Sequence, residues 1–64
     1  MVNMPLPNEY RILVYPDRTV IRQRYTWQKR FDTACTLTTE DEAIEWLVSR
    51  GIRTFKTSYR RESI

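Results

Sequence analysis

The chain contains no histidine, one cysteine and one glycine among its 64 residues, and these absences exclude several kinds of site. Without histidine, it lacks the commonest general base and metal ligand of proteins. Cys35 therefore has no partner for a Cys–His nucleophile pair or a zinc site, and it cannot form an internal disulfide. A single glycine excludes the usual glycine-rich phosphate loops. We expect a non-catalytic protein, not an enzyme, without a cofactor, a metal or a small-molecule substrate.

The sequence also lacks a long apolar run and an evident signal peptide, so we expect no membrane segment. Cys35 has small or apolar neighbours, as buried free thiols have, and a reduced thiol favours a cytoplasmic location. The length suffices for a single domain over residues 1–64, with a flexible arm over 1–8 and a frayed tail over 61–64. Dimerisation would add to a marginal core, so a homodimer stays open.

The charged residues are segregated along the chain. Two basic segments, at 18–30 and 50–61, flank an acidic segment at 40–45, and the formal net charge is +3. Nine of the eleven basic residues are arginine, whose planar guanidinium matches phosphate and carboxylate groups. The acidic segment is typical of the first turn of a helix, where carboxylates meet the positive end of the helix dipole. We therefore expect an anionic partner, and no metal at the acidic segment.

Two β-rich segments near the N-terminus predict an antiparallel hairpin. Residues 9–15 alternate in polarity, a turn begins at Pro16, and a second strand begins near Thr19. A strand that continued to the predicted helix would be far longer than usual, so we expect a bend or break near residues 28–30. Residues 31–37 could then be a bent continuation, a separate short strand or a loop.

The segment that starts at Thr39 predicts a helix over residues 39–50. Thr39 and Glu42 match a capping box, an apolar stripe at helical spacing follows, and Gly51 supplies a left-handed C-cap. Residues 52–59 form another alternating, β-rich run. The order β-β-α-β predicts a small α+β domain with a three-stranded, mostly antiparallel sheet and one helix packed on one face.

The alternation within each predicted strand divides the side chains between two faces of the sheet. We expect the helix to cover the face that carries Tyr10, Ile12, Val14, Ile21, Tyr25, Trp27, Phe55 and Tyr59. The parity of Phe31, Cys35 and Leu37 favours the same core side. The uncovered face is expected to carry Arg11, Leu13, Tyr15, Arg22, Arg24, Thr26, Gln28, Arg30, Thr54, Lys56 and Arg60.

This uncovered face is cationic and predicts a binding site. We expect contacts to the phosphates of DNA or RNA, or to an acidic protein surface, from Arg11, Tyr15, Arg22, Arg24, Gln28, Arg30, Lys56 and Arg60. The alternative is an ordinary solvated sheet face, on which arginine and threonine are common. Trp27 fits the core better than a base-stacking platform, because its parity matches that of Tyr25. An interface with a protein could form around Trp46, Glu42 and Glu45.

The motif T-T-E-D-E-A-I-E-W-L, followed by a glycine and a strand, resembles the same region of many small β-β-α-β proteins. Proteins of this size and topology include phage-encoded inhibitors of host machinery such as RNA polymerase or CRISPR complexes. Two functions follow as hypotheses. The first is a nucleic-acid-binding accessory or regulatory protein. The second is a protein-binding inhibitor or regulator of a larger host nucleoprotein enzyme, of the kind encoded by phages or mobile elements.

Overall fold

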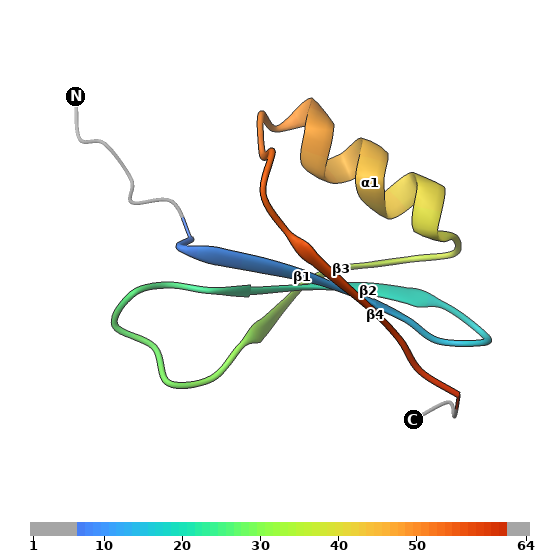
Figure 1. The fold of residues 1–64 in the computed structure, drawn as a ribbon, viewed down its shortest axis with the longest axis horizontal. Coiled ribbons are helices and arrows are strands. Elements are labelled where there is room, and N and C mark those ends of the chain that lie inside the picture. Colours follow the sequence, from blue (N-terminus) through green and yellow to red (C-terminus); the bar gives the residue numbers. More distant parts are fainter. Residues whose placement is uncertain (1–6, 62–64) are drawn as a thin grey trace.

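A helix lies across one face of a four-stranded sheet in the computed structural model, which describes residues 7–61 (Figure 1). The elements are β1 (Glu9–Val14), β2 (Thr19–Arg24), β3 (Asp32–Leu37), α1 (Glu40–Ser49) and β4 (Lys56–Tyr59). The order across the sheet is β3-β2-β1-β4. The predicted α+β class with a helix on one face is confirmed. The prediction of three strands is wrong, because residues 32–37 pair as a strand of their own.

β1 and β2 form the predicted antiparallel hairpin. Ile12 lies opposite Ile21, and both side chains are fully buried in the core with residues of α1. The turn closes with a backbone hydrogen bond of 2.8 Å, donated by the Tyr15 amide to the Arg18 carbonyl. Since neighbouring residues of a strand point to opposite faces, this register directs Arg11 away from the core.

β3 pairs antiparallel with β2 and contains a β-bulge. Ile21 lies opposite Cys35, whereas the next residue, Arg22, lies opposite Thr33. Ala34 is therefore the extra residue of the bulge. A shift of one residue moves side chains to the other face of a sheet. The bulge thus reverses the parity of every β3 residue that precedes it.

This reversal changes the predicted position of Phe31. Cys35 and Leu37, which follow the bulge, pack against the core as predicted. Phe31, which precedes it, lines a hollow on the uncovered face. The predicted core-side position of Phe31 is therefore wrong, and the reason is the extra residue in β3.

Both predicted ends of the helix are confirmed. The Glu42 amide donates to Thr39 Oγ1 at 3.3 Å, and the Thr39 amide donates to Glu42 Oε1 at 3.0 Å, which completes the capping box. Gly51 follows the helix in the left-handed region, with φ of 79°. On its inner side α1 fully buries Ala43 and Leu47. Burying one leucine stabilises the fold by roughly 1.5–3 kcal/mol.

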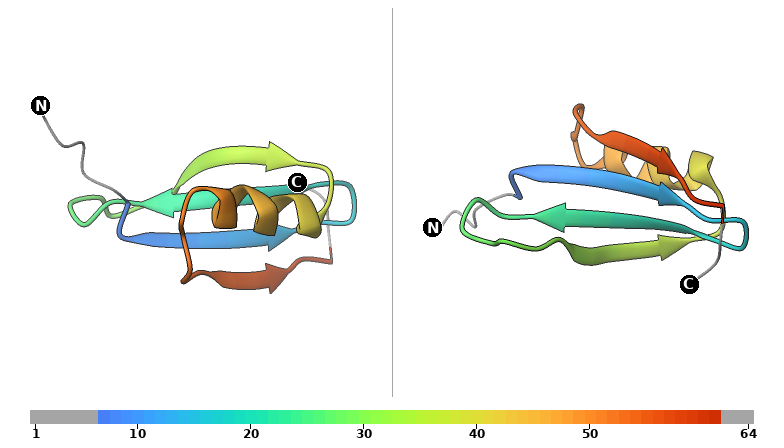
Figure 2. Two further views of the ribbon diagram at one scale, coloured as in Figure 1. Left: turned by 90° about the horizontal axis from the view of Figure 1, so that it is seen from above. Right: turned by 60° about the horizontal axis from the view of Figure 1, so that its bottom comes forward.

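β4 lies at the free edge of β1 and runs parallel to it, while α1 lies over the central strands (Figure 2). It is shorter than predicted, because residues 52–55 connect the helix to this edge without strand pairing. The ladder extends beyond β4, where the Arg60 amide donates to the Val14 carbonyl at 2.8 Å. The Tyr59 hydroxyl donates to the Glu40 carboxylate at 2.8 Å, and this hydrogen bond raises the pKa of Tyr59.

Most of the predicted N-terminal arm and C-terminal tail lies outside the described residues. Of these two segments, the structure describes Pro7, Asn8 and Arg61. The Asn8 amide donates to the Arg24 carbonyl at 2.8 Å, beside the first residue pair of β1 and β2. Within residues 7–61, no helix has the length and apolar character required to cross a membrane.

Candidate nucleic-acid interface

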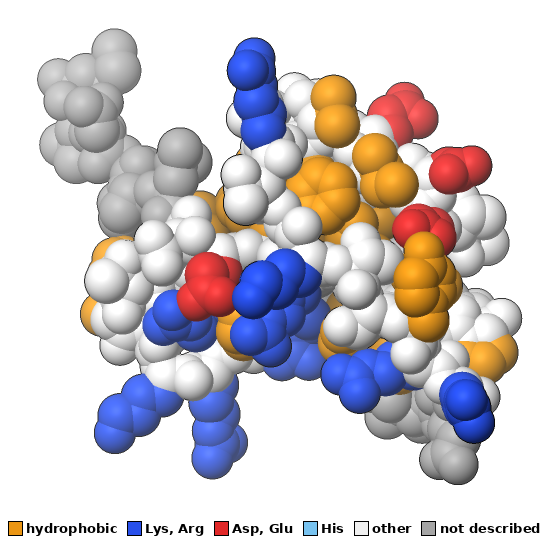
Figure 3. All heavy atoms as spheres, in the orientation of Figure 1, with side chains coloured by type: hydrophobic (Ala, Val, Ile, Leu, Met, Phe, Trp, Pro, Cys, Tyr) orange, Lys and Arg blue, Asp and Glu red, His pale blue; other side chains and the backbone are white. Residues whose placement is uncertain are grey.

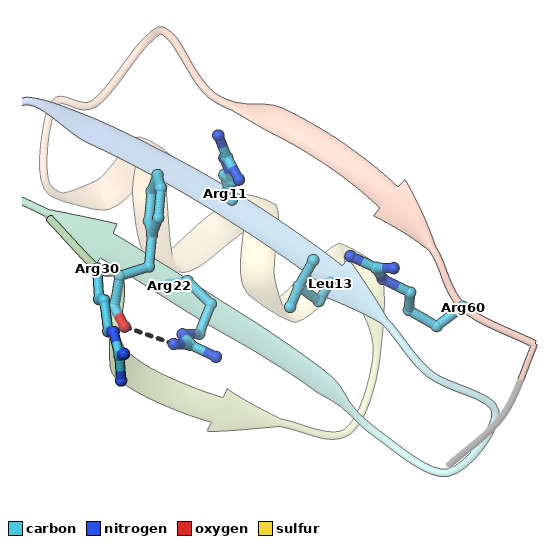
Figure 4. Close-up of a pocket in the computed structure, with 6 residues that line it drawn as sticks. Arg11, Leu13, Arg22, Arg30 and Arg60 are labelled. Atoms are coloured by element: carbon cyan, nitrogen blue, oxygen red, sulfur yellow. Dashed lines mark hydrogen bonds between the residues drawn. The ribbon is translucent and has the colours of Figure 1, made fainter. Parts of the chain in front are cut away.

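Arginines surround a hollow on the face of the sheet opposite α1 (Figure 4). The hollow measures about 380 Å³. Two strands, the loop that joins β2 to β3, and the segment after β4 all contribute to it. Its lining residues are Arg11, Leu13, Arg22, Arg30, Phe31 and Arg60. Four cations and no acid therefore line this region, which we refer to as the arginine hollow.

The strand register places basic residues side by side across three strands. Arg11 in β1 is the direct neighbour of Arg22 in β2 and of Lys56 in β4. Like charges at facing positions of a sheet repel each other and disfavour the pairing. The Glu9 carboxylate, which the charges of Arg11 and Lys56 reach, offsets part of this repulsion, and an anion bound across the row would offset more of it.

Phe31 provides an aromatic side to the arginine hollow. The Arg11 guanidinium lies 4.1 Å from the centroid of the Phe31 ring, which is within the range of a cation–π contact. Arg22 donates from Nη2 to the Phe31 carbonyl, while its Nε is buried and has no partner among the described residues. The Phe31 ring thus contacts the Arg11 guanidinium, and the Phe31 backbone carbonyl binds the Arg22 guanidinium, so Phe31 holds both groups at the arginine hollow. The sequence pattern missed this role because it carries no signal for the bulge.

Arg24, predicted to bind the ligand, is instead satisfied within the protein. Its Nε and Nη2 donate to the Glu9 carboxylate, and its Nη1 donates to the Gln28 carbonyl at 2.8 Å. The hydrogen bond from Arg24 lowers the pKa of Glu9, and the positive charges of Arg24, Arg11 and Lys56 lower it further. Each side-chain nitrogen of Arg24 thus has a partner among the described residues, unlike those of Arg30 and Arg60.

Gln28, also predicted to bind, closes the loop between β2 and β3. Its Oε1 accepts from the Tyr25 amide at 2.9 Å, and its backbone amide donates to the Tyr25 carbonyl at 3.0 Å. Its Nε2 donates to the Asp32 carboxylate at 2.6 Å. These bonds fix the course of the loop that carries Arg30 to the edge of the arginine hollow.

The other predicted residues of this face lie at different distances from the hollow. Arg30 and Arg60 line it, are exposed, and make no side-chain hydrogen bond to another described residue. Lys56 is exposed and extends the row of basic residues onto β4. Tyr15 lies at the hairpin turn, where the Arg18 guanidinium covers its ring at 4.7 Å, and it does not line the hollow.

Trp27 is exposed, and its predicted core position is wrong. β2 ends at Arg24, so the alternation on which that prediction depended does not reach Trp27. The side chain is 68% exposed, and its ring stacks on Tyr25 with centroids 4.8 Å apart and planes 15° apart. Tyr25 is half-buried and shares a hollow near the end of α1 with Tyr10 and Trp46. A stacked aromatic pair therefore projects from the loop that joins β2 to β3, and the same loop carries Arg30 of the arginine hollow.

The residues predicted for a protein interface come together on the helix side. Trp46, Glu42 and Glu45 line a hollow of about 320 Å³. Trp46 is half-buried, and the Arg50 guanidinium lies 3.6 Å from the centroid of one of its rings. This second hollow has an aromatic wall and an acidic rim.

The two sides of the molecule thus differ in charge (Figure 3). Acidic side chains gather mainly beside α1, and most of the basic side chains lie over the sheet and its loops. Among the described residues, no three Cys, Asp or Glu side chains lie close enough together to hold a metal ion.

Comparison with known proteins finds no match: no family model, no curated protein and no solved structure is similar to the chain. The β-β-β-α-β order of the described elements also differs from the β-β-α-β order on which the resemblance to small phage inhibitors was based. The function is therefore inferred from the geometry and charge of the site.

Proposed function

We propose that this protein binds nucleic acid through the arginine hollow and acts as a non-catalytic accessory or regulatory protein. The observation that carries the proposal is a group of four arginines, with no acid in the lining, on a sheet face that no other described element covers. Guanidinium groups donate to phosphate oxygens in pairs, which favours phosphate over a diffuse negative surface. Phe31 and Leu13 add apolar contacts suited to sugars and bases.

The number of arginines sets the expected dependence on salt. If each of the four neutralises one phosphate, the logarithm of the affinity falls with the logarithm of salt concentration with a slope of about −3 to −4. The measurement is fluorescence anisotropy with labelled DNA and RNA, single-stranded and duplex, between about 50 and 200 mM salt. Failure to bind any member of this panel at the lowest salt would reject the proposal.

A matched pair of variants tests whether the hollow is the binding site. Arg60→Ala removes an exposed cation that lines it, and Arg53→Ala removes an exposed cation that does not. We expect Arg60→Ala to weaken binding to every sequence alike and to reduce the salt slope by about 1. Equal effects of the two substitutions would show that binding depends on net charge rather than on the hollow.

The hollow on the helix side supports a second candidate, a protein-binding inhibitor or regulator of a larger nucleoprotein enzyme. Tryptophan is enriched among the residues that anchor protein interfaces. Trp46 lines this hollow together with Glu42 and Glu45. The test is a pull-down from lysate after nuclease treatment. One stoichiometric protein that is retained by Arg60→Ala and lost with Glu45→Lys would favour this candidate, and no enrichment would count against it.

A further inference from the structure

We infer that the preferred ligand of the arginine hollow is a single strand, from which one unpaired base stacks on Trp27. This inference rests on the proposed function and names the substrate class of the same site. It comes from the position of Trp27, which the sequence pattern assigned to the core and which the structure places in the exposed loop of residues 25–31.

One face of the Trp27 ring is covered and the other is open. The stacked ring of Tyr25, 4.8 Å away, covers the first face. Since the side chain is 68% exposed, the accessible area lies on the opposite face and the ring edges. A nucleobase on the open face would continue the stack of two rings, and stacking of this kind accepts any base.

The loop holds the ring in place before any ligand arrives. Gln28 bonds to the Tyr25 amide and carbonyl on one side of Trp27 and to Asp32 on the other. Arg24 donates to the Gln28 carbonyl at 2.8 Å and ties the loop to β2. A platform that is already ordered loses little conformational entropy on binding, so more of the stacking energy appears as affinity.

The charge around Trp27 favours a nucleic acid over an apolar protein segment. Residues 25–31 contain two cations, Lys29 and Arg30, and no acid. Arg30 lines the arginine hollow only three residues after Trp27, a separation of at most about 11 Å along the chain. One strand that passes around this end of the sheet can therefore place a base on Trp27 while its neighbouring phosphates reach Arg30. Bases inside a duplex are stacked on each other and are not available for this contact.

The experiment compares Trp27→Ala, Trp27→Phe and the control Thr26→Ala, a substitution of the exposed neighbour in the same loop. The probes are an oligothymidine single strand, a duplex of equal length, and heparin as a polyanion without bases. We expect Trp27→Ala to weaken single-strand binding roughly 5- to 150-fold and to leave duplex and heparin binding and the salt slope unchanged. We expect Trp27→Phe to retain part of the affinity and Thr26→Ala to retain all of it.

A second readout follows the ring itself. In Trp46→Phe, Trp27 is the only tryptophan, and we expect the single strand to quench its fluorescence while heparin does not. Equal binding of all three probes by Trp27→Ala and wild type would overturn the inference and leave the proposed function standing. Loss of heparin and single-strand binding to the same extent in Trp27→Ala would also overturn it. No binding of any nucleic acid would reject the proposed function itself.

Discussion

The two faces of the sheet differ in how their side chains are satisfied. Under α1, Ile12, Ile21 and Leu47 are fully buried and pack against one another. On the opposite face, Arg30 and Arg60 are exposed and make no side-chain hydrogen bond to another described residue. One face of the sheet therefore supplies stability, whereas the loop after β2 and the segment after β4 place exposed positive charge on the other face. We expect substitutions on the two faces to change different measured properties.

The largest effect is expected from the covered face. Leu47→Ala leaves a cavity in the core, and we expect the free energy of unfolding to fall by about 2–5 kcal/mol, measured by urea denaturation. Val48→Ala is the matched control, because Val48 is the next residue of α1 and is 61% exposed. Its expected effect is within about 0.5 kcal/mol. Similar losses for both variants would contradict the burial of Leu47.

A smaller loss is expected at the start of the helix. Thr39→Ala removes the hydroxyl that accepts from the Glu42 amide, and we expect the free energy of unfolding to fall by about 0.5–2 kcal/mol. Thr38→Ala, an exposed neighbour outside the capping box, should change it little. Polyanion binding should stay at the wild-type level below the unfolding transition. A change in affinity would show that the two faces are coupled.

Lys56→Glu sharpens the comparison because it should change stability and binding in opposite directions. The new carboxylate would lie beside Arg11 in the row of basic residues, and opposite charges at such positions stabilise a sheet by about 0.2–1 kcal/mol. The same substitution places a negative charge beside the arginine hollow, so polyanion affinity should fall. Thermal unfolding and anisotropy measure the two effects. If Lys56→Glu lowered both stability and affinity, the result would contradict repulsion between Lys56 and Arg11.

The smallest effect is expected from the ion pair at the edge of the open face. Arg24 lowers the pKa of Glu9 below its ordinary value of 4.5, so the folded state favours the ionised carboxylate. The stabilisation from this ion pair is present at a pH above the ordinary pKa of Glu9, and it is lost as the pH falls through the lowered pKa of the folded state. Wild type should therefore exceed Glu9→Gln in stability at neutral pH and match it in strong acid. An equal difference in stability between wild type and Glu9→Gln at both pH values would contradict a contribution from ionised Glu9.

Much of the fold follows from local patterns in the sequence. The capping box at Thr39, the glycine at position 51 and the turn after Val14 each have a backbone requirement that few residues meet, and all three are found where predicted. The alternation within β1 correctly separates Ile12 from Arg11, since one face of this strand is buried and the other is not.

The wrong predictions concern segments in which the alternation of side chains between the two faces of a strand is interrupted. Ala34 adds one residue to β3, and no residue type near it marks a bulge, so Phe31 was assigned to the wrong face. β2 ends at Arg24, and hydrogen bonds to the Gln28 carbonyl and side chain shape the loop that follows, which alternation does not describe. For the same reason Trp27 was expected in the core.

The parallel pairing of β1 with β4 brings the first and the last strand into one surface. Arg11 lies near the start and Arg60 near the end, so the complete arginine hollow exists only after the last strand has docked. The contact most distant in sequence is the costliest to close during folding. A polyanion that binds only the complete hollow would shift the unfolding equilibrium by mass action. Binding of such a polyanion would thus stabilise the pairing of β4 with β1.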